Sequence, residues 1–285
     1  ILIGTGQNGN STSFNRFIGV SGTNYSNTII GGSNQYISGS AGVRSLNTLI
    51  GGNGNSIGRD DWATSISTNI IAGGQSHAIF AGSYNGIIGG SGFWLMTGSL
   101  ETSPSYNGSL GGSNHTLNGG DYNAFVGGVS NTFNDTKQSV IVGGESNTIT
   151  QTGTFADFDS VIVGGRNNNI THARSVVLGG DGLSSSKANE VTVPSLMISG
   201  SAVGIVNEVS TVGGFVDLDC NTGNYFTITM PAGGVLDFST SDYKPGQTIN
   251  VKITQNATPS TINFDPYFEF EGGVPFVVST TAGAV

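Results

Sequence analysis

The sequence predicts an all-β protein, in which a parallel β-solenoid of short coils is followed by a small antiparallel β-sandwich. Glycine accounts for 47 of 285 residues, more than twice its usual share of about 7%. Charged residues make up only 9% of the chain, against about 25% in an ordinary globular domain. The third observation is a recurring phrase: SVIVGGESNTIT at 139–150 returns as SVIVGGRNNNIT at 160–171, identical at nine of twelve positions. Together they favour repeated short strands joined by tight turns.

The recurring phrase belongs to an array. Its double glycine stands in equivalent places at 31/32, 51/52, 73/74, 89/90, 111/112, 127/128, 143/144, 164/165 and 179/180. Successive pairs are 15 to 22 residues apart, so the unit has 15–16 residues and the longer intervals carry an inserted loop. A short period with loop-sized insertions is typical of a solenoid whose coils stack on one another. We therefore predict a β-solenoid shaft over residues 1–183.

Each coil is expected to contain two short strands. Glycine at the corner between them allows a positive φ and a close approach of backbones. Alternate residues of a strand face opposite sides, so in the first strand Val140 and Val142 point one way and Ile141 the other. The second strand, at 147–150, is apolar on one side only, and the amide of Asn147 is expected to stack on its counterpart in the adjacent coil.

The first strand of each coil is apolar on both sides, which a single interior does not explain. Continuous apolar strands are normally buried on both faces, whereas the inside of a coil covers only one. We expect the other face to form an apolar ridge that packs against identical ridges in a homotrimer, because soluble monomers rarely expose such a large apolar patch. Ile141, Ile162 and Val177 are assigned to this interface.

The repeat stops after Leu183. Residues 184–204, rich in Ser and Gly, are predicted to form a connector. In residues 205–285, apolar and polar residues alternate in short runs separated by Gly, Pro, Asn and Asp. This pattern is typical of a small antiparallel β-sandwich, which we expect to continue beyond Val285.

Both regions resemble known families. The SVIVGGxxNxIT coils are similar to the left-handed β-roll repeats of trimeric autotransporter adhesin heads and to the IIGGSNNxI arrays of phage tail fibres. Unequal coils, many inserts and GG in place of IG favour the phage fibres. The stretch from VDLDC to TAGAV, at 216–285, resembles a β-domain common near the ends of phage fibre proteins. These resemblances imply an extracellular virion fibre whose partners are other virion proteins and a glycan or protein receptor on the bacterial surface.

The composition argues against several other functions. A net charge of −9 with no basic cluster disfavours nucleic-acid binding, which requires a positive footprint. No apolar run approaches the ~20 residues that span a bilayer, so we expect no membrane insertion. We also expect no cofactor and no metal, since Cys220 is the sole cysteine. In GGNGNSIG at 51–58, the motif closest to a Ca²⁺-binding repeat, Ser56 stands where an aspartate ligand is needed.

No catalytic residue is predicted. Glycosidases need two carboxylates flanking the bond, and the acidic pairs of this chain fall in inserts or on strand faces expected to be solvated, as with Asp217 and Asp219. The three histidines are expected at surface or interface positions. Inserts on a regular scaffold are more favoured for recognition, where aromatic side chains either stack on sugar rings or fill interfaces between chains. The candidate binding residues are Asp60, Asp61, Trp62, Tyr106, Phe155 and Phe158.

Three functions are left open by the sequence. A receptor-binding phage fibre without enzyme activity is favoured. A trimeric bacterial surface adhesin is the first alternative, and the absence of a heptad run speaks against it. A polysaccharide-degrading tailspike is the second, and it would lose activity on mutation of Asp60 or Asp157.

Overall fold

The computed structural model is all-β, as predicted, and it divides into two compact units, Ile1–Leu196 and Met197–Val285. It describes residues 2–3, 15–18, 27–38, 46–58, 66–80, 82–96, 105–151, 159–197, 199, 206–244 and 246–285. Apart from one 3-10 turn, η1 (Glu271–Gly273), all regular structure among these residues is β-strand. No helix in the described part of the chain has the length and apolarity to cross a membrane.

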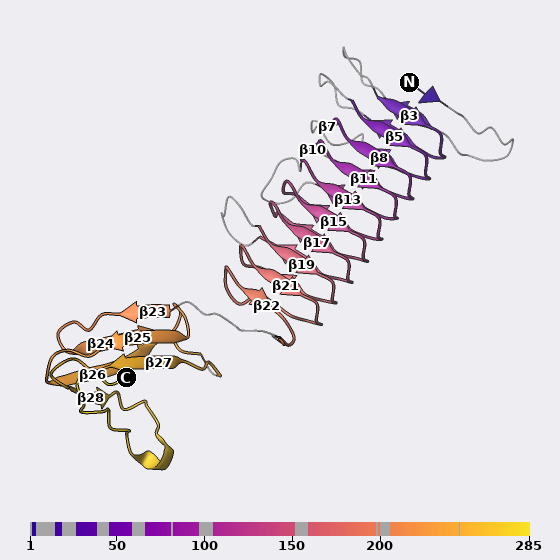
Figure 1. The fold of residues 1–285 in the computed structure, drawn as a ribbon. Coiled ribbons are helices and arrows are strands. Elements are labelled where there is room, and N and C mark those ends of the chain that lie inside the picture. The colour runs from indigo at the N-terminus through magenta and orange to yellow at the C-terminus, as the bar shows by residue number, and fades with distance from the viewer. Residues whose placement is uncertain are drawn as a thin grey trace. The chain divides into compact units, whose positions relative to one another are not determined.

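The first unit is a parallel β-solenoid of about nine coils (Figure 1). Successive strands alternate between an 11-stranded sheet, here called sheet 1, and a 9-stranded sheet, called sheet 2. All strand pairs described in this unit are parallel and keep one register, as in the pairing of Ile141 with Ile162. The solenoid predicted from the period is therefore confirmed, because each coil bonds only to the coils before and after it.

The strands of sheet 1 are β1 (Leu2–Ile3), β3 (Thr28–Ile30), β5 (Thr48–Ile50), β8 (Ile70–Ala72), β11 (Gly86–Ile88), β13 (Gly108–Leu110), β15 (Ala124–Val126), β17 (Val140–Val142), β19 (Val161–Val163), β21 (Val176–Leu178) and β22 (Val191–Thr192). Those of sheet 2 are β2 (Arg16–Ile18), β4 (Tyr36–Ser38), β6 (Ser56–Ile57), β9 (Ala78–Ile79), β12 (Trp94–Met96), β14 (Thr116–Asn118), β16 (Thr132–Asn134), β18 (Thr148–Thr150) and β20 (Asn169–Ile170). A further parallel pair joins β7 (Ile66–Ser67) to β10 (Gly82–Ser83). Strand β22 extends sheet 1 into the segment predicted to be a connector.

The double glycine forms the corner between the two strands of a coil. Gly143 and Gly144 have φ values of +68° and +75°, a region that disfavours residues with a Cβ. A Cβ on Gly144 would also lie 2.5 Å from the carbonyl oxygen of Gly165 in the next coil. Both properties predicted for this corner, positive φ and close backbone approach, are confirmed.

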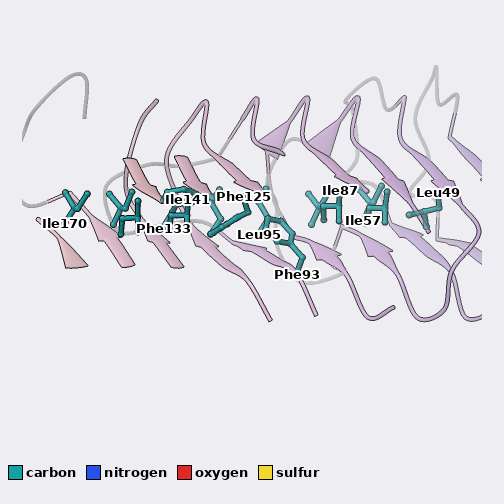
Figure 2. Close-up of a cluster of buried hydrophobic side chains, with 14 of the residues drawn as sticks. Leu49, Ile57, Ile87, Phe93, Leu95, Phe125, Phe133, Ile141 and Ile170 are labelled. Atoms are coloured by element: carbon teal, nitrogen blue, oxygen red, sulfur yellow. The ribbon is translucent and has the colours of Figure 1, made fainter. Parts of the chain in front are cut away.

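The interior of the solenoid is a file of apolar side chains between the two sheets (Figure 2). Ile141, Ile162 and Val177 lie in this file and are 0% exposed within a single chain. Their assignment to an interface between chains is therefore wrong. The period of two predicted that Ile141 and Val142 face opposite sides, but both sides are apolar, so the pattern within one strand did not say which lies inside.

Two columns of buried polar residues flank the apolar file. The first polar column precedes the strands of sheet 1, and the second polar column follows the double glycines. In the second polar column, the backbone N–H of Asn147 donates to Oδ1 of Asn131 at 2.9 Å, so equivalent residues of adjacent coils are joined by a hydrogen bond from backbone to side chain. The members of the first polar column are Asn47, Asn69, Asn85, Asn107, Asn123, Ser139, Ser160 and Ser175. Those of the second polar column are Gln35, Asn55, His77, His115, Asn131, Asn147 and Asn168, and Phe93 fills the equivalent position in its coil.

The second unit is also parallel. Its strands alternate between sheet 3, made of β23 (Val206–Val209), β25 (Tyr225–Thr229) and β27 (Asn250–Thr254), and sheet 4, made of β24 (Phe215–Asp219), β26 (Val235–Ser241) and β28 (Thr261–Phe264). All four pairings within these sheets are parallel. The antiparallel sandwich predicted for residues 205–285 is therefore wrong in strand direction. Alternation predicts which face of a strand is buried, but it does not reveal that each turn leads to the opposite sheet.

Candidate interaction surface

The outward side chains of sheet 1 form two columns, which together we call the outer face of sheet 1. The first column holds Thr28, Thr48, Ile70, Gly86, Gly108, Ala124, Val140, Val161 and Val176. The second holds Ile30, Ile50, Ala72, Ile88, Leu110, Val126, Val142, Val163 and Leu178. None of these residues is charged. Apart from Ala72, the members of the second column are exposed by 37% at Val142 to 56% at Ile88.

The outer face of sheet 1 is large for an exposed apolar surface. Its nine coils, stacked at about 4.8 Å each, make a band about 40 Å long. With side chains exposed to this extent, its accessible area is on the order of the ~800 Å² that each partner of a stable interface buries. Apolar patches above a few hundred Å² usually mark an interaction site in a soluble protein.

The outer face of sheet 2 is mainly polar, and Trp94, which is 48% exposed, is its large apolar exception. On the outer face of sheet 2, Asn118 donates to Asn134 at 2.8 Å, and Asn134 donates to Thr150 at 3.1 Å. The turn between the sheets carries an exposed ion pair, with Arg166 and Asp181 2.5 Å apart. The continuous apolar band therefore lies on the outer face of sheet 1, with mainly polar surfaces beside it, as expected of an interface with a polar surround.

Three tyrosines form a ladder at the corner before sheet 1, which we call the tyrosine ladder: Tyr84, Tyr106 and Tyr122. Their rings are parallel to within 3°, with centroids 4.8 Å and 4.9 Å apart. Each residue has a φ of +60°, which is uncommon for a bulky side chain and costs on the order of 1 kcal/mol or more. All three side chains are exposed by half or more, so burial within this chain does not offset that cost.

Two of the three histidines are inside the solenoid, which corrects their predicted surface or interface positions. His77 and His115 occupy asparagine positions in the second polar column and are 1% exposed. Nδ1 of His77 accepts a hydrogen bond from the backbone N–H of Phe93, and Nδ1 of His115 from that of Asn131, at 3.2 Å and 3.3 Å. Burial lowers the pKa of both rings, because the charged form loses its hydration.

The environments of Asp217 and Cys220 are those of structural residues rather than of catalytic ones. Asp217 accepts hydrogen bonds from the hydroxyls of Ser239 and Ser241 across sheet 4, at 2.6 Å and 2.5 Å. Cys220 lines a pocket of about 280 Å³ in the second unit. Burial, with nearby carboxylates, raises the pKa of its thiol, the opposite of what a nucleophilic cysteine requires. Among the described residues, no cluster of three or more His, Cys, Asp or Glu could hold a metal ion.

No family model, curated protein or solved structure matches this chain. The function must therefore be inferred from the surfaces of the solenoid itself.

The sequence-predicted binding residues are only partly placed by the structure. Asp60, Asp61, Trp62, Phe155 and Phe158 lie outside the described residues. Tyr106 is described, and its ring stacks on two tyrosines that the sequence analysis missed. The missed signal is positional: Tyr84, Tyr106 and Tyr122 each stand five residues before a double glycine, so aligning the coils would have revealed the ladder.

Proposed function

We propose that this chain is a structural and host-receptor-binding fibre protein of a bacteriophage virion, acting as a homotrimer whose parallel chains pack through the outer face of sheet 1. The observation that carries the proposal is the uncharged apolar band, which continues over nine coils, whereas the outer face of sheet 2 is mainly polar. Interface cores are depleted of charged residues in the same way. The resemblance of the coils to phage fibre arrays supports the virion assignment.

Sister chains suit this band better than an unrelated protein does. The band is about 40 Å long but only two outward side chains wide, and it repeats every ~4.8 Å. A second copy has the same length and the same repeat. If the rotation axis of the assembly runs parallel to the solenoid, each coil meets the identical coil of its neighbour at the same height, and the band is covered along its whole length.

Such an assembly acts mechanically and by multivalency. A stiff solenoid holds its inserts at fixed positions, and three parallel chains present three copies of each insert. Several weak contacts made together bind far more firmly than one alone. The proposed receptor is a glycan or protein on the bacterial surface, reached by the inserts rather than by the packed band.

The first test is the mass of the chain in solution. We expect sedimentation equilibrium to give three times the chain mass of 29.0 kDa, with unchanged β-structure by circular dichroism. A stable, folded monomer at micromolar concentration would contradict the proposed packing.

The second test is binding to bacteria. A fluorescently labelled oligomer should bind cells of some strains in a panel and leave others unlabelled, and binding should weaken strongly when the chains are dissociated. Release of reducing sugars from surface polysaccharide by the purified protein would instead favour the tailspike. Failure to bind any strain that the parent virion infects would contradict receptor binding.

A further inference from the structure

Gly86 and Gly108 lie on the outer face of sheet 1, where the backbone does not require glycine. Neither has a positive φ, and both sit in continuous parallel register, Gly86 with Ile70 and Gly108 with Ala124. A Cβ on Gly86 would meet nothing within 4 Å, and one on Gly108 only a carbonyl oxygen at 4.0 Å. Glycine in a strand costs about 0.5–1 kcal/mol relative to alanine. Where no bend or bulge needs it, glycine often marks the close approach of another molecule.

The same two strands carry the most prominent side chains of the band. Ile88 and Leu110, two residues after the glycines, are 56% and 55% exposed, whereas the other large members of the second column range from 37% to 42%. Side chains are thus missing from one column where those of the other are most exposed. The next strand has the small Ala124 in the first column, beside Val126, whose exposure of 41% is ordinary for the second column.

The tyrosine ladder lies beside Gly86 and Gly108, which we call the bare positions because the first column has no side chain there. Tyr84, Tyr106 and Tyr122 stand two residues before Gly86, Gly108 and Ala124 respectively. The ladder therefore runs along the two coils that carry the bare positions and the most exposed side chains, and along the next coil, with one repeat distance. Tyrosine is enriched at protein interfaces, where its ring packs and its hydroxyl stays at the polar rim.

We infer that these three coils form a heterologous contact between copies of the chain, in which the second column of one copy packs on the first column of the next. In it, Ile88 and Leu110 of one copy lie over Gly86 and Gly108 of the neighbouring copy, with the tyrosine ladder at the border. The inference rests on the proposed parallel self-association, which brings identical coils to the same height. The bare positions then admit the prominent side chains of the neighbour, and the glycines allow the two sheets to approach closely.

Mixed cysteine variants test this pairing directly. Chains carrying Gly108→Cys and chains carrying Leu110→Cys, both in a Cys220→Ser background and with different tags, are coexpressed and oxidised. We expect disulfide-linked products that contain both tags, and none from either variant alone, because the two positions meet only across the contact. A cysteine pair on the outer face of sheet 2, Thr116→Cys with Asn118→Cys, is the control and should not cross-link.

The outcomes separate this inference from the proposed function. If the unmodified chain is a monomer by sedimentation, the self-association itself fails, and the inference with it. If the mixture forms oligomers of the expected mass without linking the two tags, or if Leu110→Cys cross-links alone, the self-association stands and only this contact is wrong.

A substitution that fills the open space at Gly108 gives an independent readout. Because a Cβ on Gly108 has open space within the single chain, Gly108→Leu should preserve folding by circular dichroism and weaken association at least tenfold. Thr132→Leu on the outer face of sheet 2 is the matched control and should leave association unchanged. Wild-type association of Gly108→Leu would overturn the inference.

Discussion

Oδ1 of Asn147 accepts a hydrogen bond from the backbone N–H of Asn168, one coil further along the solenoid, at 3.0 Å. Its Nδ2 donates to the carbonyl oxygens of Gly164 and Gly165 at 3.3 Å and 3.1 Å. The backbone N–H of Asn147 donates in turn to Asn131. The Asn147 side chain thus supplies the hydrogen-bond partner of the Asn168 N–H and of the Gly164 carbonyl. It is a second donor to the Gly165 carbonyl, which also accepts from the backbone N–H of Glu145.

Replacing this asparagine should destabilise the coil. Asn147→Ala leaves the N–H of Asn168 and the carbonyl of Gly164 without their side-chain partner, and a buried unsatisfied group costs about 1–3 kcal/mol. We expect a loss of at least about 2 kcal/mol, measured as a lower thermal midpoint and faster amide exchange in the adjoining coils. Thr148→Ala, which removes an outward side chain, is the control. Equal effects of the two substitutions would contradict the role assigned to the buried amide.

Neighbouring residues on strand β17 should respond differently to the same charge. Ile141→Asp places a carboxylate in the apolar file and should abolish folding of the coil, since an unpaired buried charge costs several kcal/mol. Val142→Asp lies on the outer face of sheet 1 and should preserve the circular dichroism spectrum while lowering the mass seen in sedimentation. An unchanged mass for Val142→Asp would argue against packing through this face.

The two corner glycines should differ in their tolerance of a methyl group. At Gly143, alanine meets nothing within 4 Å and incurs only the cost of its left-handed conformation, about 1–2 kcal/mol. At Gly144, alanine adds an overlap with the carbonyl oxygen of Gly165, so we expect about 3 kcal/mol or more. Thermal unfolding of the two variants at one scan rate makes the comparison. Similar midpoints would show that the backbones are not in close contact there.

Stability should fall as the pH decreases from 7 towards 5. An unfolded histidine titrates near 6.5, and burial lowers the pKa of His77 and His115 in the folded chain. Below pH 6.5 the unfolded chain therefore binds protons that the folded chain does not, and the free energy of unfolding decreases by at most about 1.4 kcal/mol per pH unit for each ring. Thermal melts across this range should show the trend.

The control for this pH dependence is a double variant in which both buried histidines are replaced. His77→Asn with His115→Asn installs the residue that occupies equivalent positions in other coils, such as Asn55 and Asn131. We expect this variant to fold and to lose most of the slope between pH 7 and 5. If the slope persists, other groups are responsible for it.

The tyrosine ladder should matter more for association than for folding. Asparagine tolerates a positive φ better than tyrosine does, and Asn189 shows that a coil accepts it, with a φ of +59°. The triple variant Tyr84→Asn, Tyr106→Asn and Tyr122→Asn should therefore change chain stability by less than about 2 kcal/mol and weaken association severalfold in sedimentation. A large loss of stability with intact association would assign the ladder to folding instead.

Much of the first unit could be predicted from the sequence because its pattern repeats. Double glycines at a near-constant period predicted coils, corners and parallel stacking, since each additional copy supports the same interpretation. The inward face of the first strand was assigned wrongly because VIV is apolar on both sides. A comparison of the coils would have provided the missing signal. The first residue of the strand, on the outer face of sheet 1, can be Thr48 or Gly86, whereas the middle residue, in the apolar interior, is Leu49 or Ile87.

Other features left weaker signals. In the second unit, alternation revealed buried faces such as those of Val216 and Leu218 but not the direction of neighbouring strands. The double glycines at 213/214 and 233/234, 20 residues apart, were a sign of continued coiling. The buried histidines were missed because a polar ring in the interior is expected only once the hydrogen-bonding column around it is known.

The uniform cross-section of the coils makes length a separable property. Excising residues 128–143 would join Gly127 directly to Gly144, recreating the same pair of glycines and leaving one coil fewer. The shaft would then be shorter by about 4.8 Å, with both of its ends chemically unaltered. Duplication of such a segment would lengthen the shaft by the same amount. The length of the shaft can therefore be changed in fixed steps, in evolution or by design.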